Sequence, residues 1–196
     1  STDFVFDGNN SKPYKPSQSR NPINVYGQSK AEGEIAVEDI LKPTKQYLIL
    51  RTSWLMGSSG SNFALKMLDL HKKQKAISVV NDQYGSPTTT NSLSKAIWKL
   101  IDIYKKENVN LPLILHWSDL GIATWFDISV AVGEIGYKLG LLNKPVKVLP
   151  ISTKDYPTDA RRPKYSCLDS SMSQKLIGMR GIFWKENLLN LFKDIN

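Results

Sequence analysis

The stretch NVYGQSK, residues 24–30, opens a run of good helix formers, and the apolar run YLIL follows at residues 47–50. The first run predicts a helix over residues 25–41, and Pro43 marks its end. An apolar run of strand length without alternation is typical of a strand buried in a parallel sheet. With a strand tail predicted at residues 4–6, the order is strand, loop, helix, strand. This order predicts an α/β protein with a parallel sheet.

The same stretch carries a pair of residues that could take part in acid–base chemistry. Tyr26 and Lys30 stand one helical turn apart and therefore share a face of the predicted helix. A fixed positive charge beside a phenol favours the phenolate, which makes the tyrosine a usable proton donor and acceptor near neutrality. Such a donor suits the conversion of a ketone to an alcohol while a hydride arrives from elsewhere. Taken alone, this spacing is more often a surface pair.

The rest of the chain continues the alternation of helices and strands. Asn62 and Thr124 are placed to cap two of the helices, and residues 82–88 are expected to form a loop. Helices are predicted over residues 63–73, from residue 91 or 92 to 105, and over 125–139, 170–177 and 185–193, with strands at 77–80, 111–117 and 146–149.

Composition narrows the class of protein. The 196 residues are 41% apolar and 22% charged, as in ordinary globular proteins, and the formal net charge is +8. No apolar run is long enough to span a bilayer, and no signal peptide is expected. The single Cys167 allows no internal disulfide, which favours a reducing compartment and a cytoplasmic location. The lysines are scattered and match no nucleic-acid reading module, so neither a nucleic-acid nor a membrane partner is expected, and a basic nucleic-acid binder is a minor alternative.

Metal binding is not expected either, because no His, Cys, Asp or Glu spacing suggests a ligand set. The two histidines have simpler interpretations. His71 is predicted on a helix surface and His116 at a strand end.

Seven stretches in a fixed order resemble the extended short-chain dehydrogenase/reductase family. Within that family the chain resembles the dTDP-4-dehydrorhamnose reductases, which the last stretches favour over other sugar-nucleotide members. The resemblance covers essentially the whole chain. The stretches are STDFVFDG (1–8), NVYGQSK (24–30), RTSW (51–54), NFA (62–64), DQYGSPT (82–88), YPTDARRP (156–163) and SCLD (166–169).

The resemblance implies a fold and a reaction. The fold would be the C-terminal part of a doubly wound, Rossmann-like parallel sheet with a smaller α/β substrate domain. Residues 1–56 would carry the catalytic groups, and residues 57–196 would mainly form the substrate domain, with the chain interleaved between the two. The reaction would be reduction of the 4-keto group of dTDP-4-dehydro-L-rhamnose to dTDP-L-rhamnose by NADPH or NADH, in dTDP-rhamnose and cell-wall polysaccharide biosynthesis. A homodimer is a possible assembly.

The resemblance also implies residue roles. Thr2 would hydrogen-bond the substrate carbonyl or developing alkoxide, in the place many relatives give to serine. Tyr26 would donate the proton, and Lys30 would hold the nicotinamide ribose and lower the pKa of the tyrosine, so both residues would bind cofactor. Trp54 would line the sugar pocket, and Thr2 and Asp3 would sit at the substrate.

Four further residues are candidates for substrate contact with simpler explanations beside them. Asn62 and Gln83 could contact substrate, although a helix cap and a turn explain them equally well. Arg161 and Arg162 could grip a diphosphate bidentately or be surface charges.

One family feature is missing from the sequence. The Gly-x-x-Gly-x-x-Gly loop that cradles the cofactor pyrophosphate does not precede Tyr26, so the chain is expected to lack the N-terminal half of the nucleotide-binding domain and to be inactive alone. Two alternatives stay open. One is a sugar-nucleotide epimerase or dehydratase of the same family, and the other is a non-catalytic binding subunit resembling the regulatory subunit of methionine adenosyltransferase.

Overall fold

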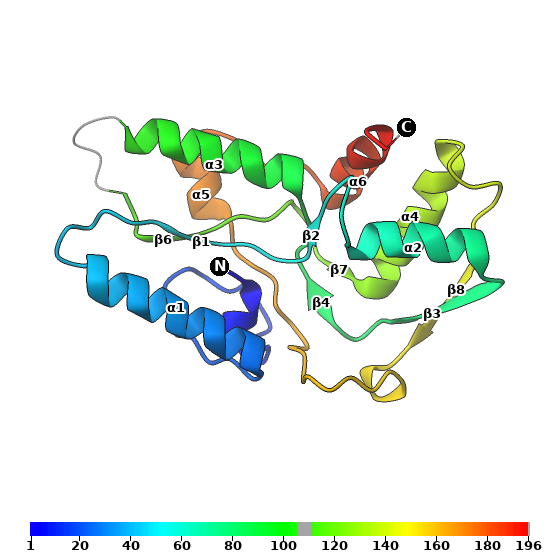
Figure 1. Ribbon diagram of the computed structural model, residues 1–196, viewed down its shortest axis with the longest axis horizontal. Helices are drawn as coiled ribbons and strands as arrows, with labels where there is room; N and C mark the ends of the chain where they lie inside the picture. The colour runs from blue at the N-terminus through cyan, green and yellow to red at the C-terminus, as the bar shows by residue number, and fades with distance from the viewer. Residues whose placement is uncertain (106–110, 196) are drawn as a thin grey trace.

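Short parallel strand pairs flanked by helices form the protein in this computed structural model, which describes residues 1–105 and 111–195 (Figure 1). The helices are α1 (Val25–Leu41), α2 (Phe63–Lys73), α3 (Thr90–Tyr104), α4 (Trp125–Lys138), α5 (Ser171–Ile177) and α6 (Trp184–Lys193), with 3-10 turns η1 (Asp3–Val5) and η2 (Thr153–Asp155). The strands are β1 (Ile49–Arg51), β2 (Leu55–Met56), β3 (Ala76–Val80), β4 (Tyr84–Gly85), β5 (Thr88–Thr89), β6 (Ile114–His116), β7 (Ala123–Thr124) and β8 (Lys147–Ile151).

The strand pairs join segments that are far apart in the sequence. β1 pairs in parallel with β6, with Ile49 opposite Ile114, and β3 pairs in parallel with β8, with Ala76 opposite Lys147. β2 and β5 form a third parallel pair, whereas β4 and β7 are antiparallel. These pairings confirm the predicted α/β class. Because β6 pairs with β1, residues 114–116 belong to the same part of the fold as residues 49–51.

The helices cover the strands in layers. Figure 1 shows α1 on one side of the β1–β6 pair and α3 with α5 on the other. Buried side chains such as Leu100, Leu115 and Trp117 fill the space on the α3–α5 side, and Val5, Phe6 and Tyr14 form a second cluster. The largest cluster joins α2, α4 and α6 to β3. Within the described residues, no helix has the length and apolar character needed to cross a membrane.

The prediction for residues 25–41 is confirmed, but the strand tail at residues 4–6 is wrong. Within residues 1–8, only Thr2 forms a parallel bridge, with Thr52. After it, the hydroxyl Oγ1 of Thr2 accepts the Phe4 N–H at 3.3 Å, and the Phe6 N–H bonds to the Asp3 carbonyl at 3.1 Å. The hydrogen bond from the Phe4 N–H to the Thr2 side chain favours the turn η1 over a strand. The apolar pattern concealed the turn, because neither Val5 nor Phe6 is exposed to solvent.

Smaller differences have similar local causes. α3 begins at Thr90 because Thr89, rather than residue 91 or 92, caps it by accepting the Ser92 N–H. The strand predicted over 111–117 is confined to β6, and the predicted loop 82–88 contains β4 and the start of β5.

His71 also differs from its prediction, because it is buried instead of lying on a helix surface. Its Nδ1 accepts the Val146 N–H at 3.2 Å, and its Nε2 lies 3.0 Å from the Ser129 carbonyl oxygen. The ring thus ties α2 to α4 and to the segment before β8.

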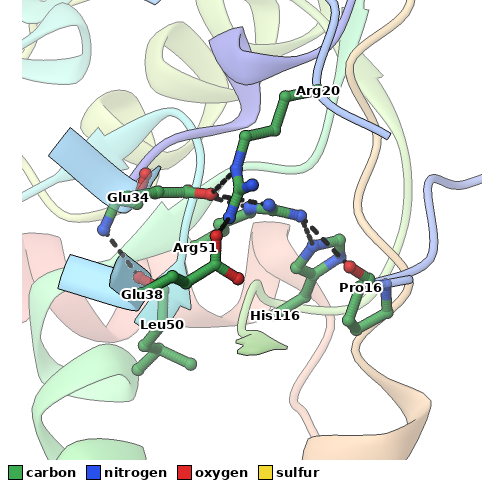
Figure 2. A network of polar contacts seen from close by, with 8 residues as sticks. Pro16, Arg20, Glu34, Glu38, Leu50, Arg51 and His116 are labelled. Carbon is green, nitrogen blue, oxygen red and sulfur yellow. Dashed lines mark hydrogen bonds and ion pairs between the residues drawn. The ribbon is translucent and has the colours of Figure 1, made fainter. Parts of the chain in front are cut away.

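A buried ion pair fixes α1 against the sheet (Figure 2). Arg51, at the end of β1, donates from Nε to Glu34 Oε1 at 2.9 Å and from Nη2 to Glu34 Oε2 at 2.6 Å. The two side chains are only 1% and 3% exposed. Arg20 adds a second contact to Glu34 at 2.5 Å and bonds Glu38 at 2.6 Å. Burial alone would raise the pKa of Glu34, but the hydrogen bonds from its cationic neighbours outweigh burial and lower that pKa to about 2.

His116 completes this network on the side of β6. Its Nδ1 lies 3.0 Å from the Tyr14 carbonyl oxygen, and its Nε2 lies 3.4 Å from Arg51 Nη1. Because arginine can only donate, Nε2 is the acceptor and Nδ1 carries the hydrogen. Burial, aided by the positive charge of Arg51, lowers the pKa of His116 to about 3.

Gly27 lets the start of α1 approach η1 closely. A Cβ at this position would lie 2.2 Å from the Phe4 carbonyl oxygen. The Gly27 N–H is capped by Asn24 Oδ1 at 2.7 Å, and the rings of Phe4 and Tyr26 meet edge-on at 5.8 Å. The absence of a side chain at residue 27 therefore sets the distance between Tyr26 and the segment that carries Thr2.

The buried histidine predicts a pH-dependent stability. Below its ordinary pKa of 6.5, the unfolded chain binds a proton at His116 that the folded chain does not bind until about pH 3. The contribution of neutral His116 to the free energy of unfolding is therefore fully present above pH 6.5. It is lost as the pH falls, by up to about 1.4 kcal/mol per pH unit. We expect the difference in unfolding free energy between wild type and His116→Asn to shrink from pH 7 to pH 5 in urea denaturation. Because Asp3 and Glu34 titrate in both proteins, the difference isolates His116, and a constant difference would contradict the assignment.

The close approach at Gly27 predicts that Gly27→Ala destabilises the protein. The added methyl group must displace backbone, at a cost of about 1–3 kcal/mol for such overpacking. Gly33→Ala is the matched control in the same helix, because nothing lies within 4 Å of its added Cβ. That control should be neutral or stabilising by up to about 1 kcal/mol. Equal effects of the two variants in chemical denaturation would show that the contact with Phe4 is unimportant.

Candidate active site

Tyr26 and Lys30 lie together at the start of α1. The ammonium nitrogen of Lys30 is 5.7 Å from the centroid of the Tyr26 ring, so the two side chains share one face of the helix. Tyr26 is 51% exposed, and one edge of its ring rests on Phe4. The phenol is therefore supported from one side and open to a ligand on the other.

Thr2 and Asp3 lie in the turn on which α1 packs. The hydroxyl Oγ1 of Thr2 lies 3.0 Å from Asp3 Oδ1. Asp3 is 2% exposed, and its Oδ2 has no hydrogen-bond partner among the described residues. Burial raises the pKa of Asp3 to about 6, although the nearby hydroxyl groups of Ser166 and Thr2 oppose the rise. The carboxyl group of Asp3 is enclosed and faces Thr2, and its contact with substrate stays a prediction.

A second group of predicted residues meets in a pocket of about 500 Å³. Asn62, Gln83 and Arg162 all line it, together with Lys66 of α2 and Trp125 of α4. The wall combines an aromatic surface with two cationic side chains, which suits a ligand with a flat ring and an anionic group. Thr2, Tyr26 and Lys30 are not among its lining residues.

Asn62 and Gln83 use their polar atoms inside the protein. Asn62 caps α2 by accepting the Leu65 N–H at 3.2 Å, and it donates to the Gly57 carbonyl at 2.9 Å. Gln83 accepts the Trp125 indole N–H at 3.1 Å and donates to the Thr153 hydroxyl at 3.0 Å. Both side chains therefore hold the pocket wall in place.

Trp54 backs this wall. Its ring stacks on Trp125 with centroids 3.6 Å apart and planes within 8°. Its backbone is left-handed, with φ of 45°, and a Cβ on Gly85 would collide with the indole. Sequence reasoning missed Trp125, which it treated only as a helix start; an indole directly after a helix cap was the available signal.

One loop joins the two groups. Arg162 lines the pocket, and the carbonyl of the adjacent Arg161 accepts a hydrogen bond of 2.8 Å from Asn24 Nδ2. Asn24 also caps α1, one residue before the helix starts. The arginine-bearing loop thus runs from the pocket to the helix start beside Tyr26.

A larger cavity is unrelated to these residues. It measures about 750 Å³, runs along β1 and α3, and has a mainly apolar lining that includes Leu50, Leu93 and Ile97. None of the predicted site residues lines this cavity. Its lining does include Ser1, which precedes Thr2, and Thr52, which pairs with Thr2. The chemistry of the first two groups therefore identifies the candidate site better than cavity size does.

The chain is similar to known proteins that are named for nucleotide-sugar and polysaccharide biosynthesis. The chain is 36% identical over 192 residues to a dTDP-4-dehydrorhamnose reductase from Aggregatibacter actinomycetemcomitans, and the match covers 97% of this chain and 64% of that protein. It is 37% identical to the spore coat polysaccharide biosynthesis protein SpsK of Bacillus subtilis (strain 168), covering 99% of this chain and 62% of the relative. The chain thus spans somewhat less than two thirds of the length of these relatives.

Solved structures confirm the Rossmann-like α/β class. A dTDP-4-dehydrorhamnose reductase from Bacillus anthracis str. Ames in complex with NADP superimposes with a TM-score of 0.85 at 37% identity, covering 99% of this chain and 64% of that one. A UDP-glucuronic acid 4-epimerase from Bacillus cereus shares the fold, with a TM-score of 0.75 at 16% identity, covering 100% of this chain and 58% of that one. The model of the RmlD substrate binding domain matches residues 1–196. The chain therefore belongs to the RmlD substrate binding domain family.

Proposed function

We propose that this chain is the catalytic and substrate-binding part of a reductase that uses NADPH or NADH to convert dTDP-4-dehydro-L-rhamnose to dTDP-L-rhamnose. The observation that carries the proposal is the solvent-open Tyr26–Lys30 pair packed against the turn of Thr2. It occurs in a chain that matches its family over the whole length and is 36% identical to a dTDP-4-dehydrorhamnose reductase.

Each group at the start of α1 has a role in this reaction. The nicotinamide cofactor, when bound, supplies the hydride that adds to C4 of the sugar. Tyr26 gives its phenolic proton to the C4 oxygen, and Thr2 hydrogen-bonds the same oxygen as negative charge develops. Lys30 holds the nicotinamide ribose and stabilises the phenolate that remains.

The residues at the start of α1 fit part of the cofactor. Tyr26 and Lys30 present a hydroxyl and an ammonium group on one exposed face, and ribose hydroxyls can bond to both. No glycine-rich phosphate loop precedes them in the sequence. The chain spans 64% of the length of the reductase it matches, and we propose the activity for a protein of that full length rather than for these 196 residues alone.

The pocket suits the nucleotide part of the substrate. Arg162 and Lys66 supply positive charge for the diphosphate, and Trp125, supported by Trp54 and Gln83, offers a flat apolar wall. In this arrangement residues 1–56 carry the reacting groups and residues 57–196 mainly bind the nucleotide sugar. A homodimer and a cytoplasmic location stay predictions.

The epimerase alternative has weaker support. Its fold is the same, but the epimerase structure is 16% identical to this chain, whereas named reductases reach 36% and 37%. An assay separates the two, because an epimerase shows no net oxidation of NADPH.

Replacing Tyr26 by Phe tests the proton donor. In the full-length protein, kcat for NADPH oxidation with dTDP-4-dehydro-L-rhamnose should fall by about 100-fold or more, since a general acid contributes 10²–10⁴-fold. NADPH affinity, measured by fluorescence titration, should change little. Tyr137→Phe, at an exposed tyrosine of α4, is the control and should keep full turnover. Unchanged kcat in Tyr26→Phe would remove Tyr26 from the reaction.

The two arginines test the pocket. Arg162→Gln should raise KM for the dTDP sugar by about 10-fold or more, because hydrogen bonds to charged groups contribute about 1.5–3 kcal/mol. Arg161→Gln is the matched control, because Arg161 lies next in the chain but is not a lining residue. Equal effects of the two substitutions would argue for a general charge effect instead of a diphosphate contact.

A further inference from the structure

The hydroxyl of Thr2 is hydrogen-bonded to Asp3 in the structure. Thr2 Oγ1 lies 3.0 Å from Asp3 Oδ1 and also accepts the Phe4 N–H at 3.3 Å. Thr2 is 7% exposed and Asp3 is 2% exposed, so water does not compete freely for either group.

The direction of the Thr2–Asp3 hydrogen bond depends on a proton. A hydroxyl has one hydrogen to donate and two lone pairs that accept. If Asp3 is ionised, it can only accept, so Thr2 gives its hydrogen to Asp3 and has none left for a ligand. If Asp3 is protonated, it donates to Thr2 Oγ1. Thr2 then accepts from Asp3 and from Phe4, and its own hydrogen is free.

We propose that Asp3 is a positioning residue that must be protonated, and donate to Thr2 Oγ1, for Thr2 to donate to the keto oxygen of the substrate. This inference rests on the proposed function, in which Thr2 touches the C4 oxygen. The proton on Asp3 stays there during the reaction; it only turns the Thr2 hydroxyl toward the substrate.

The surroundings of Asp3 favour its neutral form. Its Oδ2 lacks a hydrogen-bond partner in the described part of the chain, which is costly for a carboxylate and less so for an acid. Burial raises the pKa of Asp3 to about 6, within reach of physiological pH. Burial also raises the pKa of the neighbouring Cys167 thiol to about 11, so that thiol stays uncharged when Asp3 titrates.

Other titratable or charged groups lie on the elements packed around η1, and they bear on any pH profile. They are Asp7 and Tyr14 in the following loop, Tyr26, Lys30 and Glu34 on α1, Arg51 on β1, His116 on β6, and Tyr165 and Cys167 before α5. A comparison of wild type with a variant of Asp3 alone leaves all of these unchanged.

The inference predicts a specific pH profile. Above the pKa of Asp3, a proton must be taken up before Thr2 can donate, so kcat/KM should fall by up to about tenfold per pH unit until it reaches the level of a protein without the Thr2 donor. In Asp3→Asn the amide Nδ2 replaces the acid as a permanent donor to Thr2. The decline that begins near pH 6 should therefore disappear, and Asp3→Asn should exceed wild type at pH 8.

The experiment measures kcat/KM for NADPH oxidation from pH 5.5 to 8.5 in the full-length protein. Asp7→Asn is the matched control, because Asp7 is a nearby accessible carboxylate, and it should keep the wild-type profile. Thr2→Val should lose about 10-fold or more in kcat/KM at pH 5.5, through loss of the bond to the developing alkoxide. This loss should shrink as the pH rises, because ionised Asp3 already takes the Thr2 hydrogen in wild type. A folded Asp3→Asn that is inactive, or that keeps the wild-type profile, would overturn the inference.

A second measurement does not need Asp3→Asn to fold. Titration calorimetry in two buffers of different ionisation enthalpy counts the protons taken up when dTDP-4-dehydro-L-rhamnose binds the NADP⁺ form, which cannot deliver a hydride. At pH 7.5 wild type should take up nearly one proton and Thr2→Val none, and equal uptake by the two proteins would contradict the role of Asp3. If wild type does not oxidise NADPH, the proposed function itself is wrong. If wild type is active but Asp3→Asn is inactive or keeps the wild-type profile, or proton uptake by wild type and Thr2→Val is equal, only this inference is wrong.

Discussion

The ion pair between Arg51 and Glu34 is the interaction on which the rest of the site depends. Two opposite charges, both almost fully buried, meet through two parallel hydrogen bonds at the point where β1 ends and α1 crosses it. Removing Glu34 would leave the buried charge of Arg51 without a carboxylate partner, at a cost of about 3–5 kcal/mol. The geometry is also specific, since a planar guanidinium accepts a carboxylate in few orientations. The pair therefore fixes both the position and the rotation of α1.

The rotation of α1 decides where Tyr26 points. Glu34 faces the sheet together with Gly27 and Ala31, and Tyr26 and Lys30, at the edge of that face, stay exposed beside η1. The bare backbone of Gly27 sets the remaining distance, because it rests on the Phe4 carbonyl. The position of the Tyr26 phenol is thus set by Glu34, Arg51 and Gly27, as the supporting residues of a preorganised site would set it.

How far the sequence predicted this structure depended on whether the deciding contacts were local. The bounds of α1 follow from its composition and from Pro43, and the caps at Asn62 and Thr124 were visible in the sequence. η1 was missed because residues 4–6 have the apolar pattern of a strand, whereas the Thr2 hydroxyl accepts the Phe4 N–H and favours a turn. The burial of His71 and the stack of Trp54 on Trp125 depend on partners more than fifty residues away, which no local pattern contains. The pair Tyr26–Lys30 was recognisable because both residues lie on one helical turn, whereas the pocket around Trp125 required the fold.

Asn24 performs two tasks with one side chain, and the amide is the group that permits both. Its oxygen holds the first turn of α1 while its nitrogen holds the loop of Arg161 and Arg162. Aspartate, serine or threonine would serve the helix equally well, but a carboxylate could not hold the loop carbonyl, because it has no hydrogen to give. The two tasks are mechanically linked as a result. The start of α1 beside Tyr26 and the loop that carries the pocket residue Arg162 are therefore anchored by the same side chain.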